Sequence, residues 1–195
     1  MFKGIIDTAP DFNAESFAPS GFFSTIYDSE GNVVDTLVGT NANRIEATYD
    51  EFPEDLINAF VAIEDSRFWQ HSGIDLRSIT RAAVGVLTNN YQGGASTLTQ
   101  QLIKNTVFGG GMETSTGARI ERKIQEQYLA LQLTKNVDRK IIITNYLNTI
   151  NLGAGSYGVQ AASKKYFNKD VWDLNLSECA TLAGITQNPT KFNPI

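Results

Sequence analysis

Apolar residues recur every three to four positions over most of the chain after residue 53, which predicts helices rather than strands. The first helix follows Pro53, with Glu54 and Asp55 in its first turn, where acidic side chains face the positive end of the helix dipole. Six further segments carry the same pattern: 75–87, 97–107, 119–133, 138–152, 159–167 and 176–185. Pro189 and Pro194 end it.

The segment before residue 53 has a different character. Two β-rich runs, 24–28 and 33–38, flank a turn with Gly31 and Asn32, a pattern typical of a β-hairpin. Residues 1–20 contain Pro10 and Pro19 and are expected to be irregular. We therefore expect a mainly α domain over residues 21–195 with a small N-terminal β-hairpin.

Two glycine-rich stretches interrupt the helical pattern. Gly93 and Gly94 separate the second and third predicted helices. Three glycines at 109–111 open a segment that we expect to be a mobile loop up to Gly117.

Composition limits the classes of function. The 195 residues are 42% hydrophobic and carry a net charge of -5, so a packed domain without general nucleic-acid binding is expected. Residues 117–140 reverse this balance, with six basic residues against three acidic ones, and leave room for an anionic ligand. The single Cys179 excludes an internal disulfide, and with the single His71 it excludes a zinc site built mainly from these residue types.

No apolar run is long enough to span a bilayer, and the first residues turn polar too quickly for a signal peptide. The sequence therefore indicates either a soluble protein or a piece of a longer chain.

The first candidate site is the acidic pair Glu64 and Asp65 at the end of the first helix. Carboxylates there face the negative pole of the dipole, and apolar residues surround the pair, which would make Glu64 a better proton acceptor than a solvated carboxylate. A solvated pair bound to Arg67 is the plainer interpretation, as is a structural hydrogen-bonding role for His71.

The second candidate is the segment GGASTLTQQLIKN at 93–105. Its spacing fits neither a phosphate-binding loop nor a nucleophile elbow. The hydrogen-bonding residues suit a sugar or polar headgroup, although an ordinary capped surface helix would look similar. These residues are Ser96, Thr97, Thr99, Gln100, Gln101 and Lys104.

The third candidate is the helix 119–133. Arg119, Arg122, Lys123 and Glu126 share one face of it. The pair Arg122–Glu126 fits a surface salt bridge, whereas the alternative is that the three cations bind a phosphate with Glu126 ionised among them.

Together these motifs resemble the glycosyltransferase domain of class A penicillin-binding proteins and their monofunctional relatives, glycosyltransferase family 51. The resemblance runs from about residue 20 to residue 195. It rests on EDSRFWQHSG at 64–73, GASTLTQQLIKN at 94–105, RKIQE at 122–126, YLN at 146–148 with Gly153, and LSECATLAG at 176–184 followed by Asn188-Pro189.

The resemblance implies a lysozyme-like, two-lobed α fold and a reaction that joins lipid II units into glycan strands. Glu64 would be the general base that deprotonates the acceptor hydroxyl, in an inverting displacement of polyprenyl pyrophosphate. Glu126 would be the second catalytic carboxylate and orient the donor. No organic cofactor is implied, but a divalent cation, Mg²⁺ or Mn²⁺, would assist at the pyrophosphate.

The resemblance also implies the substrate-binding residues. Asp65, Phe68 and His71 would shape the catalytic turn. Ser96, Thr97, Gln100 and Gln101 would position sugar and phosphate, and Lys104, Arg119, Arg122 and Lys123 would offset the pyrophosphate charge.

By the same resemblance, the partners are lipid II, the growing lipid-linked glycan and the membrane surface, which Leu87, Val107 and Phe108 would touch. We expect a place on the outer face of the bacterial cytoplasmic membrane, an N-terminal anchoring helix, a transpeptidase domain in a longer parent, and binding of moenomycin-type antibiotics.

Two positions depart from the family pattern. Thr144 stands where relatives usually have glutamate, which leaves the local packing or salt bridge open. Cys179 replaces a usual alanine and is expected to be a buried small hydrophobe.

Two other functions stay under consideration. A lysozyme-like glycan hydrolase would share the fold but would gain little from the cations around Arg122. A non-catalytic glycan-binding module would not require Glu64 or Glu126.

Overall fold

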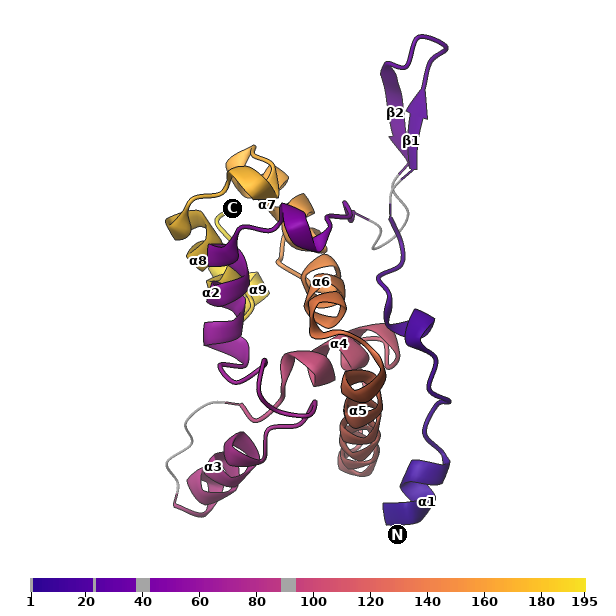
Figure 1. Cartoon of the computed structure of the whole chain (residues 1–195), viewed down its shortest axis with the longest axis vertical. Helices are drawn as coiled ribbons and strands as arrows, with labels where there is room; N and C mark the ends of the chain where they lie inside the picture. Colours follow the sequence, from indigo (N-terminus) through magenta and orange to yellow (C-terminus); the bar gives the residue numbers. More distant parts are fainter. Residues whose placement is uncertain (1, 23, 38–42, 89–93) are drawn as a thin grey trace. The chain divides into compact units, whose positions relative to one another are not determined.

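The computed structural model describes residues 2–22, 24–37, 43–88 and 94–195, and they are mainly helical (Figure 1). The helices are α1 (Phe2–Asp7), α2 (Glu54–Glu64), α3 (Leu76–Leu87), α4 (Leu98–Thr106), α5 (Thr116–Asn136), α6 (Arg139–Thr149), α7 (Val159–Phe167), α8 (Leu176–Ile185) and α9 (Pro189–Phe192). Short 3-10 turns lie at Ala14–Phe17, Tyr49–Glu51 and Val171–Asp173. The predicted fold class is confirmed.

The hairpin is also confirmed. Strands β1 (Ser24–Tyr27) and β2 (Val33–Leu37) pair antiparallel, with Ser24 opposite Leu37 and a register irregularity after Ile26. The predicted second run extended to residue 38, which lies outside the described residues.

Helix boundaries follow local capping. The predicted starts at 75 and 97 are the N-caps Asp75 and Thr97, whose side chains accept backbone N–H groups of the first turn. Helix α5 begins earlier than predicted because Ser115 caps it, and α6 ends at Thr149 rather than at 152.

Two short helices were missed. Residues 1–20 were expected to be irregular, but α1 forms there, and Gln125 of α5 donates hydrogen bonds to the Ile5 carbonyl and the Thr8 hydroxyl. Pro189 was taken as the end of the helical pattern. It instead opens α9, because proline suits the first helical turn and Asn188 caps it.

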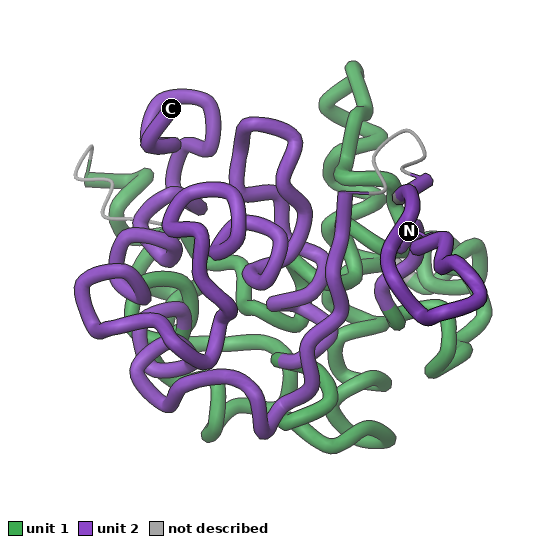
Figure 2. The backbone as a smooth tube through the Cα atoms, turned by 90° about the horizontal axis from the view of Figure 1, so that it is seen from above, with its two compact units in different colours: residues 1–18, 61–143 green, residues 19–60, 144–195 purple. Residues whose placement is uncertain are grey.

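The chain divides into two compact units (Figure 2). Unit 1 comprises Met1–Ala18 and Val61–Ile143, and unit 2 comprises Pro19–Phe60 and Thr144–Ile195. The boundaries fall inside α2 and α6.

In unit 1, α4 packs against α5, and the buried core comes from α4, α5 and the turn after α2. Its fully buried side chains include Phe68, Leu98, Leu102, Ile103, Leu129 and Leu133. This core carries the candidate site, because the polar motifs of the three candidate segments all lie in unit 1.

Unit 2 has its own core. Phe60 meets Tyr146 edge to face, with ring centroids 6.2 Å apart. Asn148 exchanges two hydrogen bonds with the Ala47 backbone, at 3.0 and 2.7 Å, and accepts one from Arg44 through its carbonyl. The YLN motif therefore has a structural role here.

The two departures from the family pattern are accommodated. Ile142 and Ile143, just before Thr144, are buried. Cys179 is also buried, as expected, and burial raises the pKa of its thiol to about 11.

Candidate active site

Glu64 is the last residue of α2, as the sequence predicted. It is half-buried, and its carboxylate accepts a hydrogen bond of 2.6 Å from the Gln101 side-chain amide of α4. An amide donor at this distance fixes the orientation of the carboxylate. The first two candidate motifs therefore meet directly.

Asp65 is buried and joins three segments. Its carboxylate accepts the Leu98 backbone N–H at 3.1 Å and contacts Nε2 of His71 at 2.8 Å. The Gly73 N–H donates to Nδ1 of His71 at 3.1 Å. Because Nδ1 accepts a hydrogen bond, Nε2 carries the ring proton and donates a hydrogen bond to Asp65. Asp65 and His71 thus hold the turn 65–73 against the start of α4.

Arg139 of α6 holds the same turn from another direction. Its guanidinium donates to the backbone carbonyls of Phe68 and His71 and lies 5.8 Å from the centre of the Phe68 ring. Phe68 is fully buried and packs edge to face on Trp69, 4.8 Å between ring centres. The planar fork of arginine suits two carbonyl acceptors, so Arg139 is a positioning residue. From the sequence, Arg139 was distinguished only as one of the six basic residues of 117–140.

The start of α4 uses two of the predicted substrate-binding residues in a capping box. The Thr97 N–H donates to the Gln100 side chain at 2.9 Å, and the Gln100 N–H donates to the Thr97 hydroxyl at 3.2 Å. Thr97 also donates to the Gly73 carbonyl at 2.7 Å. Both side chains are buried, so they hold the start of α4 in place beneath the surface of the site.

Glu126 is fully buried in α5, which separates it from an ordinary surface salt bridge. One oxygen accepts from the Arg122 guanidinium and the other from the Lys123 ammonium at 2.8 Å. Lys123 also donates to the Ser96 hydroxyl at 3.0 Å. Two cations and one carboxylate of α5 are thereby tied to the segment that precedes α4.

Lys104 connects the two carboxylates. Burial and the nearby positive charges of Lys123 and Arg122 lower the pKa of its ammonium, while the negative charges of Glu126 and Glu64 oppose this shift. The side-chain ammonium of Lys104 forms no hydrogen bond or ion pair with another residue in the described part of the chain. It therefore offers a half-buried positive charge to a ligand, and this charge interacts with those of both carboxylates.

Glu113, from the segment between α4 and α5, was not predicted as a site residue. Its carboxylate accepts from Nε of Arg122 at 2.7 Å, and its backbone carbonyl accepts from Nε of the exposed Arg119 at 3.0 Å. Burial alone would lower the pKa of Arg122, but its bonds to Glu113 and Glu126 raise it. A lone glutamate in a glycine-rich segment gave no sequence signal of this contact.

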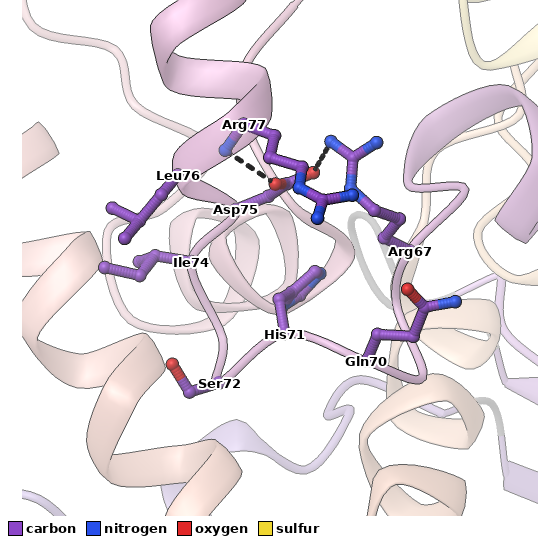
Figure 3. A pocket seen from close by; sticks show the side chains of 8 residues that line it. All are labelled: Arg67, Gln70, His71, Ser72, Ile74, Asp75, Leu76 and Arg77. Atoms are coloured by element: carbon purple, nitrogen blue, oxygen red, sulfur yellow. Dashed lines mark hydrogen bonds and ion pairs between the residues drawn. The ribbon is translucent and has the colours of Figure 1, made fainter.

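Asp75 and Arg67 form an ion pair of 2.5 Å at the start of α3 (Figure 3). Burial would raise the pKa of Asp75, but hydrogen bonds from Arg67 and Ser78 lower it to about 2. Arg67 was weighed as a partner of the pair Glu64 and Asp65, but the structure pairs it with Asp75.

The structure thus brings most of the predicted residues together in unit 1. Such a group of carboxylates and cations suits transfer of a group from an anionic donor. The chain belongs to the transglycosylase family, whose sequence pattern matches residues 30–195.

Its relatives include penicillin-binding protein 1A of Clostridium novyi, 46% identical over 97% of this chain and 22% of that protein. Penicillin-binding protein 1A of Clostridium perfringens strain 13 is 42% identical over 97% of this chain and 28% of the relative. That of Aquifex aeolicus is 44% identical over 88% of this chain and 23% of the relative. The chain therefore spans about a quarter of the length of these proteins.

Proposed function

We propose that this domain is a peptidoglycan glycosyltransferase that polymerises lipid II into glycan strands. The observation that carries the proposal is the pairing of the buried Glu126 with Arg122 and Lys123 on α5. The charge of Lys104 on α4 interacts with both Glu126 and Glu64. A reaction that expels pyrophosphate needs a proton acceptor near the attacking hydroxyl and cations near the leaving group.

Glu64 is proposed as the general base. Gln101 fixes its carboxylate, and Asp65 holds the following turn through His71 and Leu98. The acceptor hydroxyl gives its proton to Glu64 as its oxygen attacks the anomeric carbon of the donor. The bond to the pyrophosphate oxygen breaks in the same step, so the configuration at that carbon inverts.

The cations are proposed to stabilise the pyrophosphate that leaves. Lys104 is the half-buried one, and Arg119 presents an exposed guanidinium at the start of α5. Arg122 and Lys123 are fixed by Glu126, which orients them without cancelling all of their charge. Ser96 and Gln101 would position the sugar and phosphate groups.

A divalent cation was expected at the pyrophosphate. The described residues contain no group of three histidine, cysteine or acidic side chains placed to hold a metal. Both oxygens of Glu126 already accept hydrogen bonds from cations. The described residues therefore form no ready ligand set for Mg²⁺ or Mn²⁺.

The hydrolase alternative lacks an observation in its favour. Cleavage of a neutral glycan needs an activated water and no set of cations for the leaving group. The deciding experiment incubates the purified protein with labelled lipid II and, separately, with preformed peptidoglycan. Glycan strands from lipid II support the transferase, whereas release of fragments from peptidoglycan without strand synthesis would contradict it.

For the full-length protein we propose a place on the outer face of the cytoplasmic membrane and an accompanying transpeptidase domain. Relatives named penicillin-binding protein 1A, of which this chain covers 22 to 28%, support the larger architecture. No described helix has the length and apolar character to cross a membrane. Leu87 is 85% exposed, while Val107 and Phe108 are half-buried, so Leu87 is the best placed of the three to touch the membrane surface.

A further inference from the structure

A hollow of about 450 Å³ lies between the turn 67–74 and the first turn of α3 (Figure 3). It is lined by Arg67, Gln70, His71, Ser72, Ile74, Asp75, Leu76 and Arg77. The same turn carries His71, which holds Asp65 next to Glu64. A ligand in the hollow would therefore bind on the segment that shapes the candidate active site.

Asp75, the only carboxylate among the described residues that line the hollow, is saturated with hydrogen bonds. One oxygen of Asp75 accepts the backbone N–H groups of Arg77 at 3.0 Å and Ser78 at 3.3 Å. The other accepts from the Arg67 guanidinium at 2.5 Å and the Ser78 hydroxyl at 2.9 Å. Asp75 can thus neutralise one arginine but has no remaining acceptor for a second one.

Arg77 supplies that second positive charge. It is exposed, and its guanidinium forms no hydrogen bond or ion pair with another residue in the described ranges. In Figure 3 its side chain points toward Asp75 and Arg67. Nε of Arg67 is also buried without a described partner. Two guanidinium groups beside one satisfied carboxylate leave an excess of positive charge, which favours an anion in the hollow.

The rest of the lining points to the type of anion. Gln70 and Ser72 provide an amide and a hydroxyl, while Ile74 and Leu76 provide an apolar wall. The end of a peptide combines the matching groups: a carboxylate, backbone amides and small apolar side chains. An inorganic phosphate would leave the apolar wall without a partner.

We propose that this hollow is a subsite for a carboxylate of the stem peptide of the glycan precursor, with Arg77 as its direct partner. This inference rests on the proposed function, because it assigns a further part of the same substrate. The guanidinium of Arg77 binds the carboxylate, and Gln70 and Ser72 bind the adjoining amides.

The test uses two forms of lipid II as substrates. In one form the stem carboxylates are free, and in the other they are amidated. The variants are Arg77→Gln and, as a matched control, Arg81→Gln, which changes an exposed arginine one turn further along α3 outside the lining of this hollow. Arg77→Gln should raise KM for the free-carboxylate substrate roughly tenfold, the value of one charge-assisted hydrogen bond. Arg77→Gln should leave kcat unchanged, and it should leave the KM for the amidated substrate unchanged. Arg81→Gln should change neither kcat nor the KM for either substrate.

A second measurement does not depend on turnover. A soluble stem peptide with free carboxylates should bind the wild-type protein more tightly than its amidated form, and Arg77→Gln should remove this difference. Equal binding of both peptides, or an equal effect of Arg77→Gln on both lipid substrates, would overturn the subsite.

The other source of an anion is a phospholipid headgroup. If Arg77→Gln weakens binding to phosphatidylglycerol vesicles but leaves the discrimination between stem peptides intact, the hollow is a headgroup site and the proposal is wrong. Strand synthesis by the wild type without any dependence on the stem carboxylate contradicts only the subsite. Absence of strand synthesis with intact peptide discrimination contradicts only the proposed reaction.

Discussion

Gly73 lies so close to α5 that a β-carbon built on it would come within 2.2 Å of the Ala130 carbonyl oxygen. The residue also has a φ of +97°, a conformation that disfavours side chains. This contact seats the turn that carries Asp65, Phe68 and His71 on the helix that carries Glu126. The turn that follows Glu64 and the helix that carries Glu126, the two carboxylates proposed as catalytic, are therefore connected through a close backbone approach.

Gly73→Ala should destabilise the domain by about 3 kcal/mol, because steric overlap adds to the unfavourable φ. Gly31→Ala is the matched control, since Gly31 has a φ of +85° in the hairpin turn with no atom within 4 Å of the added carbon. It should cost about 1 kcal/mol. Urea denaturation measures the free energy of unfolding of both variants. Equal losses in this free energy would show that the close approach to Ala130 does not add to the cost of Gly73→Ala.

Glu126→Gln removes the carboxylate that Arg122 and Lys123 share. We expect a loss of about 2 to 3 kcal/mol in the free energy of unfolding, less than for a fully enclosed pair because Lys123 is partly exposed. Glu121→Gln, an exposed change on the same helix, should stay within about 0.5 kcal/mol. Thermal unfolding of both variants tests this, and similar midpoints would indicate that Glu126 is not held as described.

Glu113 occupies Arg122 in a way that a phosphate group could replace. The Arg122 guanidinium holds the pKa of Glu113 below its usual range, so the contact persists at neutral pH and is lost only as the pH falls below that lowered value. Glu113→Gln should therefore tighten binding of a labelled moenomycin-type donor mimic roughly twofold, since a partly solvent-accessible ion pair is weak.

The same variant should make the segment 109–113 easier to cleave in limited proteolysis, because one of its attachments to α5 is weakened. Glu121→Gln serves as the control here too. Unchanged donor-mimic affinity together with unchanged cleavage would show that Glu113 does not restrain this segment.

Asp75 gives a pH dependence of stability. Its folded pKa of about 2 lies below the ordinary 3.8, so its stabilising contribution is present above pH 4 and is lost as the pH falls through 2. Asp75→Asn keeps a good helix cap but removes the charge, and should cost up to about 2 kcal/mol near pH 6.

The difference between Asp75→Asn and the wild type should shrink between pH 4 and 2. Urea denaturation across this range measures the difference in the free energy of unfolding. Asp138→Asn is the control, because the exposed Asp138 accepts the Lys140 N–H in the way that Asp75 accepts the Arg77 N–H. A difference that is independent of pH would exclude the ion pair with Arg67 as its source.

The helical pattern was readable from the sequence because apolar spacing and N-cap residues are local signals. The predicted bounds of α7 and α8 agree with the structure. Helix α1 was missed because its stability comes from packing on α5, through contacts such as Gln125 to Ile5, which are far apart in the sequence.

Site residues could be predicted where they belong to a recognisable sequence motif. The role of each residue was harder to predict, because it depends on contacts between motifs. Thr97 and Gln100 were expected to bind substrate, yet the structure commits both to the capping box. Glu113 and Arg139 contribute only through partners nine and about seventy residues away, Arg122 and the turn at Phe68. The assignment of substrate-binding roles stays a prediction.

The most direct test of the central claim is the rate of glycan strand synthesis from labelled lipid II by Glu64→Gln. The variant keeps the size of the side chain but removes the proton acceptor, so the rate should fall by about a hundredfold or more. Binding of a donor mimic should be retained, because the cations on α4 and α5 are unchanged. Strand synthesis by Glu64→Gln at close to the wild-type rate would contradict the assignment of Glu64 as the general base.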